Sequence, residues 1–451
     1  MKDLLEDSVR RARIYLDGLS ERSVAPRTED ITRLRELRIS LPDHPTSPEE
    51  VLKTLDEVGS PATVASAGPR YFGFVTGGAL PASLAASVLA SAWDQNAHLS
   101  VSSPIAAALE DVALGWIRDL LSLSPEWGGG FVTGTTMGNF ACLAAARHHV
   151  LANSGWDVEA MGLFGAPKIQ VIVGDEVHAT LLKALALLGL GRDRVVRVPV
   201  DDQGRMRADS LPDDLSPPSI VCLQAGNVNT GAFDPIRPIT RWARRGGAWV
   251  HVDGAFGLWA AVSPKTAGLT DGISEVDSIA TDLHKWPNAP YDSGLSLYRR
   301  PEDARRALSM TAAYLPASDD RQPCHYTPES SRRARGVEIW AVLLSLGRSG
   351  IDALVERCCR LAGRFAEGFS KAGFEVLNEV VLNQVLVSFG DDATTRAVIQ
   401  AVQDEGTCWC GGTFWQGRAA MRVSVSSWAT TDQDVERSLD AIIRVARRVS
   451  T

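Results

Sequence analysis

The stretch AWVHVDG at residues 248–254 is an apolar run that ends in a carboxylate and a glycine. Two similar runs follow it, VDSIATD at 276–282 and GLSLYR at 294–299. Apolar runs of this kind, without sustained alternation of apolar and polar residues, are typical of strands buried on both faces of a sheet. The three runs therefore predict central strands of one large sheet.

Four earlier runs extend this pattern towards the N-terminus: GGFVT at 129–133, KIQVIVGD at 168–175, RVVRVPV at 194–200 and SIVCLQA at 219–225. Helical stretches such as MGNFACLAAARHHVLA and HATLLKALALLGLG lie between most of these strands. Strands that alternate with helices predict an α/β fold, with a mostly parallel seven-stranded sheet covered by helices on both faces. Ligands of such sheets collect at the carboxyl ends of the strands.

Three segments make up the predicted domain organisation. Residues 1–65 read as an amphipathic helical arm with too few apolar residues for a core of its own, so we expect the arm to lie on another surface, such as a second subunit. Residues 66–300 form the large domain with the sheet. Residues 301–451 are mainly helical, with the strands NQVLVSF and AAMRVSVSSW, and predict a smaller C-terminal α+β domain.

The composition excludes several classes of protein. A formal net charge of −8 over 451 residues disfavours nucleic-acid binding, which usually needs a basic face. Seven cysteines, an odd number without metal-ligand spacing, predict reduced thiols and no metal site. The N-terminus is charged throughout, unlike a signal peptide, and no uncharged run reaches the roughly 18 residues of a membrane span. We therefore expect a cytoplasmic protein without a membrane partner.

Two strand ends carry polar residues that open a helix. In FVTGTTMGNF, Gly134, Thr135 and Thr136 precede a helix, and backbone amides with two hydroxyls suit a phosphate dianion. A threonine N-cap beside a turn glycine is the alternative interpretation. In VHATLLKAL, His178 also stands where a strand passes into a helix, as a catalytic group or as a cap.

A third strand end places a carboxylate in a buried position. Strand alternation in WVHVDGAFG puts His251, Asp253 and Ala255 on one face. A carboxylate at the end of a buried strand is costly unless a cation or hydrogen-bond donors meet it, and the small neighbours leave room for a flat group. Capping of the next turn by Asp253 is the alternative.

The segment DLHKWPNAPYDSG at 282–294 follows a strand and is stiffened by prolines. Its Lys285, beside His284, can act as an amine nucleophile towards a carbonyl once it is partly desolvated. An ion pair with Asp253 or Asp282 is the alternative. The four strand ends together describe a ligand with a phosphate, a ring nitrogen and an aldehyde, and pyridoxal 5′-phosphate (PLP) has all three.

These segments resemble a known family. SIATDLHKWPNAPYDSG looks like the lysine motif of the pyridoxal-dependent amino-acid decarboxylases, which include the aromatic amino-acid, histidine and glutamate enzymes. WVHVDGAFG resembles their HVDAAYGG segment, and FVTGTTMGNF their phosphate-binding loop. The resemblance covers roughly residues 50–450 and implies the PLP-dependent transferase fold, fold type I.

The resemblance also implies a role for each matching residue. Lys285 would form the Schiff base with PLP, and Asp253 would pair with the pyridine nitrogen. His178 would stack on the ring, and Ala255 would pack beneath it. Decarboxylation of an L-amino acid to its amine and CO₂ would follow.

Further cofactor contacts are implied by the same motifs. Thr135 and Thr136 would hold the phosphate, and His284 would lie near cofactor and substrate. In AGNVNTGAFDPI, Asn227 and Val228 stand where the family has threonines, so Asn227 is a further cofactor-binding candidate.

The proton donor to Cα is predicted in the region YLPASDDRQPCHYTPESSRRARG. Tyr326 is the candidate by resemblance, and His325 and His178 are the alternatives. Packing at the domain edge is the structural interpretation of Tyr326. By the same resemblance, Arg422 on a late strand is a candidate for binding the substrate carboxylate.

The segment PRYFGFVTGGALPAS resembles the substrate-pocket lining of the family. Its Tyr71, Phe72 and Phe74 offer aromatic surface without a fixed charge, which favours an aromatic or apolar substrate side chain. The resemblance further implies a homodimer with shared active sites. An aldehyde synthase, a transaminase, a carbon–carbon lyase or a non-catalytic homologue remain alternatives.

Overall fold

The computed structural model describes residues 2–309 and 321–449, which form two compact units. One unit comprises the chain up to Gly78, Leu361–Leu377 and the chain from Val385 onwards. The other comprises Ala79–Arg360 and Asn378–Gln384. This division differs from the predicted boundaries after residues 65 and 300, because the N-terminal segment packs with C-terminal residues.

Arg70 shows the reason for the difference within the first unit. Its buried guanidinium donates hydrogen bonds to the carbonyl oxygen of Thr407 at 2.7 Å and to that of Ser20 at 2.5 Å. One side chain thereby joins two segments that are far apart in the sequence.

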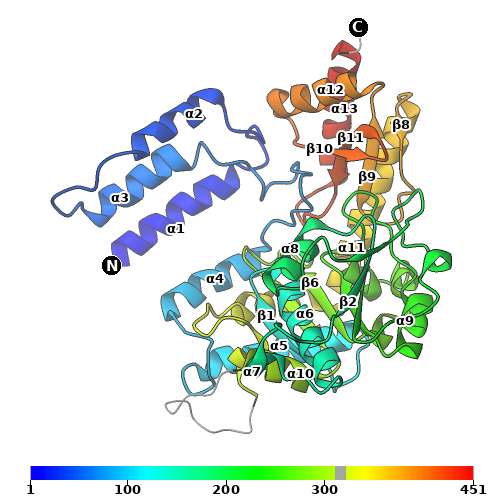
Figure 1. Ribbon diagram of the computed structural model, residues 1–451. Coiled ribbons are helices and arrows are strands. Elements are labelled where there is room, and N and C mark those ends of the chain that lie inside the picture. Colours follow the sequence, from blue (N-terminus) through cyan, green and yellow to red (C-terminus); the bar gives the residue numbers. More distant parts are fainter. Residues whose placement is uncertain (1, 310–320, 450–451) are drawn as a thin grey trace. The chain divides into compact units, whose positions relative to one another are not determined.

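The larger unit contains a seven-stranded sheet (Figure 1). Its strands are β1 (Gly128–Val132), β2 (Gln170–Gly174), β3 (Val196–Val198), β4 (Ser219–Gln224), β5 (Trp249–Asp253), β6 (Ser278–Asp282) and β7 (Gly294–Tyr298). The order is β1-β7-β6-β5-β4-β2-β3, with only β7 antiparallel to its two neighbours. The predicted mostly parallel seven-stranded sheet is confirmed, and every strand lies within or beside a predicted run.

The larger unit also contains helices. They are α4 (Pro81–Trp93), α5 (Pro104–Leu120), α6 (Thr135–Ala152), α7 (Val158–Met161), α8 (Ala179–Leu187), α9 (Ile236–Arg245), α10 (Pro301–Leu308) and α11 (Gly336–Lys371), whose last turns belong to the other unit. Short helical turns are η3 (Ala208–Ser210), η4 (Gly257–Val262), η5 (Ala267–Thr270), η6 (Ile273–Glu275) and η7 (Pro323–Tyr326). Helix α6 packs against β5, β6 and β7, and α9 packs against β5.

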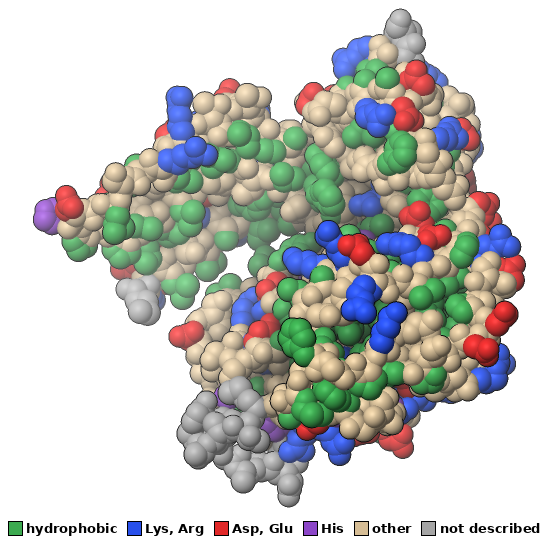
Figure 2. Space-filling model, viewed as in Figure 1, with side chains coloured by type: hydrophobic (Ala, Val, Ile, Leu, Met, Phe, Trp, Pro, Cys, Tyr) green, Lys and Arg blue, Asp and Glu red, His purple; other side chains and the backbone are tan. Residues whose placement is uncertain are grey.

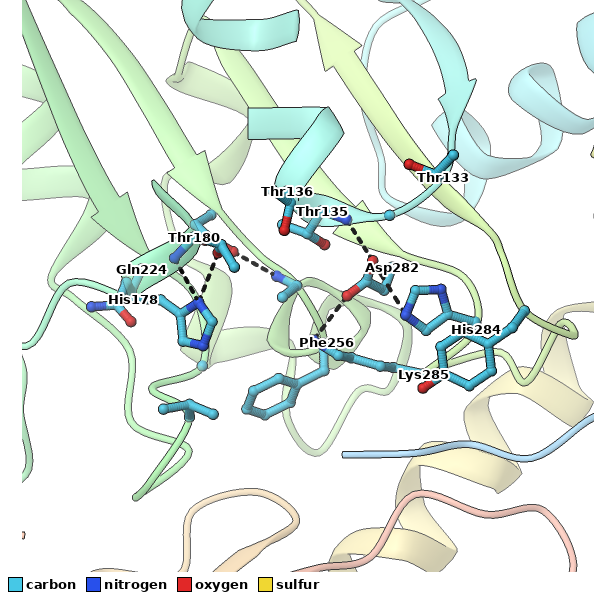
Figure 3. Close-up of a pocket in the computed structure, with 16 residues that line it drawn as sticks. Thr133, Thr135, Thr136, His178, Thr180, Gln224, Phe256, Asp282, His284 and Lys285 are labelled. Carbon is cyan, nitrogen blue, oxygen red and sulfur yellow. Dashed lines mark hydrogen bonds and ion pairs between the residues drawn. The ribbon is translucent and has the colours of Figure 1, made fainter. Parts of the chain in front are cut away.

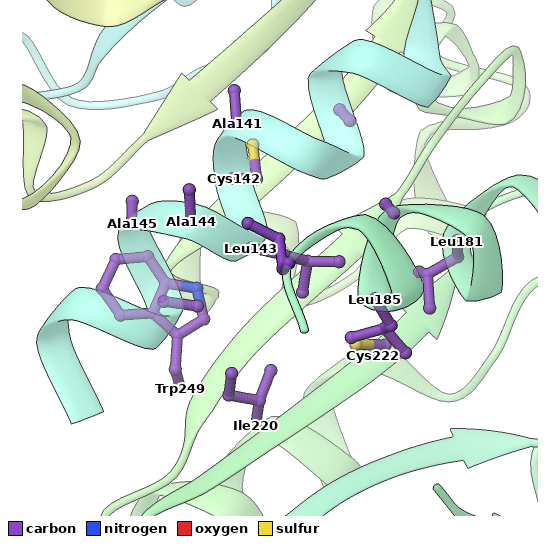
Figure 4. Close-up of a cluster of buried hydrophobic side chains, with 14 of the residues drawn as sticks. Ala141, Cys142, Leu143, Ala144, Ala145, Leu181, Leu185, Ile220, Cys222 and Trp249 are labelled. Carbon is purple, nitrogen blue, oxygen red and sulfur yellow. The ribbon is translucent and has the colours of Figure 1, made fainter. Parts of the chain in front are cut away.

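The core on the α6 side of the sheet is built from small and branched side chains (Figure 4). Alanines of α6, among them Ala141, Ala144 and Ala145, let the helix approach the strands, while Leu185 of α8 and Trp249 of β5 fill the remaining space. Complete burial of a leucine side chain stabilises the fold by roughly 2 kcal/mol. The close approach places the first turn of α6 beside the ends of the central strands.

The smaller unit holds the remaining elements. Its sheet has the order β10-β11-β9-β8, from β8 (Glu375–Val376), β9 (Gln384–Ser388), β10 (Gly411–Trp415) and β11 (Arg418–Ser424). Its helices are α1 (Lys2–Asp17), α2 (Thr28–Arg33), α3 (Pro48–Thr54), α12 (Asp392–Glu405) and α13 (Asp432–Val449), with the turns η1 (Leu34–Leu37) and η2 (Leu55–Gly59). The predicted late strands correspond to β9 and β11, in the predicted α+β arrangement.

Helices α1, α2 and α3 contain no buried residue within their described ranges. Figure 2 shows hydrophobic side chains on the surface of this region. The exposed apolar residues of this part of the sequence include Leu5, Val9, Ile14, Leu16, Ile31, Val51 and Leu55. In the described part of the chain, none of the helices combines the length and the apolar character that a membrane span requires.

Candidate active site

A cavity of about 330 Å³ lies at the carboxyl ends of the central strands of the larger unit (Figure 3). The predicted residues that line it are Thr135, Thr136, His178, Asp253, Ala255, His284 and Lys285. Other lining residues include Thr180, Gln224, Val228, Phe256, Asp282 and Tyr291. Its volume is at the lower end of the range of ligand pockets, about 300–1,000 Å³. One cavity thus joins the predicted lysine and the predicted carboxylate.

Lys285 forms an ion pair with Asp282, with 2.8 Å between its Nζ and the Oδ2 atom. The ammonium also lies 6.0 Å from the centre of the Phe256 ring, at the limit of a cation–π contact. The sequence analysis left two possible ion-pair partners for Lys285, Asp253 and Asp282. In the structure the partner is Asp282. Figure 3 shows this pair beside the start of α6.

Asp282 is held at the start of α6 as well. Its Oδ1 atom accepts a hydrogen bond from the backbone N–H of Thr135 at 2.6 Å. Burial would raise the pKa of the Asp282 carboxyl, but Lys285 and the Thr135 amide outweigh that effect, so this pKa lies below its usual value. The carboxylate is ionised, and it neutralises the part-buried ammonium of Lys285.

The first turn of α6 presents polar groups to the cavity. The hydroxyl oxygen of Thr135 is buried and has no hydrogen-bond partner among the described residues. A Cβ atom on Gly134 would lie 3.2 Å from both Asp282 Oδ1 and the Cε1 atom of His284, so glycine permits the close approach of these groups. An unsatisfied hydroxyl at a helix N-terminus suits a phosphate oxygen, so the residues present fit the phosphate of PLP.

Asp253 is oriented by two donors. Asn139 Nδ2 donates to its Oδ2 atom at 2.8 Å, and the backbone N–H of Ala255 donates to its Oδ1 atom at 3.1 Å. The side chain is buried and lines the cavity. A carboxylate held in this way can accept a hydrogen bond from a protonated ring nitrogen. PLP carries such a nitrogen in its pyridine ring.

A chain of hydrogen bonds supports Asn139 from behind. His251 Nε2 lies 2.9 Å from Asn139 Oδ1, and His251 Nδ1 lies 2.9 Å from the hydroxyl of Ser278. Burial lowers the pKa of the His251 imidazole to about 3, so the ring is neutral. Since Asn139 Oδ1 only accepts, the proton of His251 resides on Nε2, and Ser278 donates to Nδ1.

His178 caps a helix and also lines the cavity, while its contact with the cofactor stays a prediction. As the N-cap of α8, its Nδ1 atom accepts a hydrogen bond from the backbone N–H of Thr180 at 3.3 Å. Its ring simultaneously lines the cavity (Figure 3). The cap orients the imidazole, since a ring anchored through Nδ1 cannot turn freely.

The comparisons with known proteins agree with this geometry. The profile of the pyridoxal-dependent decarboxylase conserved domain matches residues 32–390. The chain belongs to this decarboxylase family. It is a PLP-dependent amino-acid decarboxylase, and PLP is its cofactor.

Two curated relatives of the decarboxylase act on different substrates. It is 26% identical to tryptophan decarboxylase 1 of Oryza sativa subsp. japonica, over 95% of this chain and 90% of that protein. It is 29% identical to L-2,4-diaminobutyrate decarboxylase of Rhizobium meliloti, over 83% and 77% of the two chains. The crystal structure of Oryza sativa TDC with PLP and tryptamine has a TM-score of 0.91 at 22% identity, covering 100% and 98% of the two chains. The fold is therefore the predicted fold type I.

Asn227 of the decarboxylase does not line the cavity within the described residues. Its Oδ1 atom accepts from the backbone N–H groups of Asn229 at 2.8 Å and Thr230 at 3.3 Å, so the side chain stabilises its own turn. Val228, the next residue, lines the cavity instead. A contact of Asn227 with the cofactor stays a prediction that the geometry does not favour.

Tyr326 is also not among the described residues that line the cavity. Its ring packs at the edge of the core cluster, and the guanidinium of Arg321 lies 5.2 Å from the ring centre. His325, the neighbouring alternative, does not line the cavity either. Within a single chain, Tyr326 therefore has a packing role, which is the alternative to proton donation.

The four predicted substrate-binding residues belong to the smaller unit. Tyr71 and Phe74 stack on Trp409, with ring centres 5.1 and 5.5 Å apart, and Phe74 is 63% exposed. Phe72 is 1% exposed and packs edge-on against Phe365, so its ring is a core side chain rather than a free binding surface.

Arg422 lies on β11, opposite Gly411 of β10. Burial lowers the pKa of its guanidinium. A part-buried arginine can bind a carboxylate, and that role remains a prediction.

Sequence reasoning missed three residues that shape the site: Asn139, Phe256 and Tyr291. Asn139 follows Thr135 by four positions, so helix periodicity placed it on the same face of α6. Tyr291 carried no such signal, because its segment has no regular periodicity.

Proposed function

We propose that the decarboxylase converts an L-amino acid with an aromatic or apolar side chain to its amine and CO₂. Lys285, Asp253 and the first turn of α6 line one cavity, and this observation carries the proposal. The aromatic character of the predicted substrate-binding residues Tyr71 and Phe74 and the similarity to a tryptophan decarboxylase support the substrate class.

Each residue would have a defined task. PLP supplies an electron sink for the charge that remains on Cα when the carboxylate leaves. Lys285 would bind the cofactor covalently, and Asp253 would keep a proton on the ring nitrogen through charge complementarity. Thr135, Thr136 and the α6 amides would hold the phosphate, and His178 would cover one face of the ring.

A proton must then reach Cα. Tyr326 would be the donor only if it entered the cavity of a second subunit, because it does not line that of its own chain in the described structure. His178, which does line the cavity, would be the donor within a single chain. Mixed dimers distinguish the two assignments. A dimer of one Tyr326 variant chain and one Lys285 variant chain should regain activity only if Tyr326 acts in the cavity of the other subunit.

We further propose a cytoplasmic homodimer whose active sites take residues from both chains. The exposed apolar side chains on α1, α2 and α3 support this proposal, because such helices gain stability only when another surface covers them.

Reconstitution with PLP tests the proposal. The purified protein is incubated with each of the twenty amino acids, and CO₂ and amine are quantified together. Equal amounts from an aromatic substrate support a decarboxylase, whereas CO₂ with aldehyde indicates the aldehyde synthase alternative. Release from acidic or diamino substrates alone would contradict the proposed substrate class.

Lys285→Ala is the matched test of covalent binding. We expect its PLP absorbance band to differ from that of the parent protein and CO₂ release to disappear, since no amine remains in the cavity. Lys168→Ala, which removes an exposed lysine, serves as control. Binding of PLP by neither parent nor control would favour a non-catalytic homologue.

A further inference from the structure

His284 lies between an aromatic ring and the anion-binding end of α6. The rings of His284 and Tyr291 are stacked, with centres 4.3 Å apart and planes 29° from parallel. On its other edge, His284 Nε2 lies 3.6 Å from Asp282 Oδ1, and its Cε1 atom faces Gly134. His284 is 8% exposed, whereas Tyr291 is 59% exposed.

The backbone determines which ring nitrogen carries the proton. The N–H of Ser293 donates a hydrogen bond to His284 Nδ1 at 3.3 Å. A backbone N–H can only donate, so Nδ1 must present its lone pair. In a neutral imidazole the proton then resides on Nε2, at the edge that faces the start of α6.

The ring is neutral for a separate reason. Burial lowers the pKa of His284, and the attraction of Asp282 does not offset that effect. The distance of 3.6 Å from Nε2 to Asp282 exceeds the usual hydrogen-bond range. Among the described residues, the Nε2 proton therefore has no carboxylate within hydrogen-bond range, and it is directed towards the cavity.

The residues on both sides of Ser293, Asp292 and Gly294, are each held by a contact with another part of the chain. Arg335 donates to Asp292 through Nε at 2.8 Å and through Nη2 at 3.3 Å, an arrangement that fixes the carboxylate plane. On the other side, Ser293 is followed by Gly294, which pairs with Asp282 in the sheet. The stacked tyrosine and the donating N–H therefore belong to one anchored turn.

We propose that Tyr291 and Arg335 are positioning residues that hold His284 as a neutral ring with its proton on Nε2, so that it donates a hydrogen bond to a phosphate oxygen of the cofactor. This inference rests on the proposed covalent PLP site. Tyr291 acts through its ring, by stacking, and Arg335 acts through Asp292 on the backbone of Ser293.

Paired variants of Tyr291 test the inference. Tyr291→Ala removes the stacked ring, whereas Tyr291→Phe keeps the ring and removes the hydroxyl. We expect Tyr291→Ala to weaken PLP binding by about tenfold and Tyr291→Phe to bind as the parent protein does. Phe164→Ala removes an aromatic side chain that is 99% exposed and is the matched control.

Nitrogen NMR of the histidines supplies a readout that a general loss of packing does not mimic. The chain has eight histidines, and His284→Gln assigns the resonances of interest. In the cofactor-free protein we expect the Nε2–H form in the parent and in Tyr291→Phe, and a mixture of forms in Tyr291→Ala. Arg335→Lys, which loses the two-point contact, should shift the same resonances towards the mixture.

The outcomes separate this inference from the proposed function. Unchanged affinity and unchanged histidine resonances in Tyr291→Ala would overturn it, as would a Tyr291→Phe variant that behaves like Tyr291→Ala. Because the resonances are recorded without cofactor and substrate, a parent protein that binds PLP but releases no CO₂ refutes the proposed function alone.

Discussion

At the scale of single residues, Asp253 is a buried carboxylate that its neighbours orient towards the cavity. Two donors, Asn139 and the Ala255 amide, orient the carboxylate, and the supporting imidazole of His251 stays neutral. A carboxylate that is buried without a cation would be costly, so its retention beside the cavity is consistent with a cationic ring as its partner.

Asp253→Asn tests this charge. The amide has nearly the same shape but cannot stabilise a proton on the ring nitrogen, so we expect turnover to fall by about a hundredfold or more. Steady-state kinetics with saturating PLP measure the effect. Asp193→Asn, whose parent side chain is 90% exposed, should keep parental activity. Parental turnover in Asp253→Asn would contradict the assigned role.

His251 makes a prediction about pH. The unfolded chain binds a proton at this imidazole as the pH falls below about 6.5, whereas the folded chain does so only near a pKa of about 3. The unfolded state thus holds more protons in this window, and the contribution of His251 to stability is lost as the pH falls through it.

Chemical denaturation at pH 7 and pH 5 measures that loss. Relative to His251→Gln, the parent protein should lose about 2 kcal/mol more stability between these values. His44→Gln, at an exposed position, should follow the parent. Equal pH dependence in all three proteins would show that His251 is not the titrating group.

At the scale of elements, the position of α6 decides the geometry of the site. A Cβ atom on Gly138 would lie 3.0 Å from the Cβ atom of Ala280 and 3.3 Å from the carbonyl oxygen of Leu295. The glycine allows α6 to lie on β6 and β7, and the helix carries Thr135 and Asn139 into the cavity region. The packing of α6 on the sheet therefore also sets the positions of the residues at the proposed site.

Gly138→Ala tests that coupling. The added methyl group should push α6 from the strands and lower stability by about 1–3 kcal/mol, with weaker PLP binding. Gly363→Ala, at a helical position with no atom within 4 Å of the added Cβ, should be neutral or stabilising. Denaturation and PLP titration of both variants provide the measurement, and a Gly138→Ala variant that matches Gly363→Ala would refute the argument.

At the scale of the whole molecule, the proposed homodimer explains the helices that lack a covering surface. Leu5 and Val9 are about half exposed, at 51% and 50%, and lie on one face of α1. A second copy of the chain would remove such side chains from water, at roughly 25 cal/mol per Å² of apolar area.

The double variant Leu5→Glu with Val9→Glu tests the assembly. We expect the mass from light scattering to shift from dimer towards monomer, because two carboxylates in an apolar interface are strongly unfavourable. Leu187→Glu, at a 61% exposed position of α8, should remain dimeric. A parent protein of monomer mass would refute the homodimer.

The sequence by itself determined the sheet and the cofactor, and it predicted the cavity residues Lys285, Asp253 and Thr135. Strand runs and strand ends are local patterns, and the carboxyl ends of parallel strands meet at one edge whatever the intervening helices are. The local rules therefore sufficed to bring residues 150 positions apart in the sequence to one predicted site.

Only the tertiary structure decided which partners support that site. Asn139 meets Asp253 across 114 positions, and Arg335 meets Asp292 across 43, through contacts that no periodicity encodes. For the same reason Asn227 turned out to stabilise its own loop and Tyr326 to lie outside the cavity. Side-chain direction depends on packing against distant segments, and that packing exists only after the chain has folded.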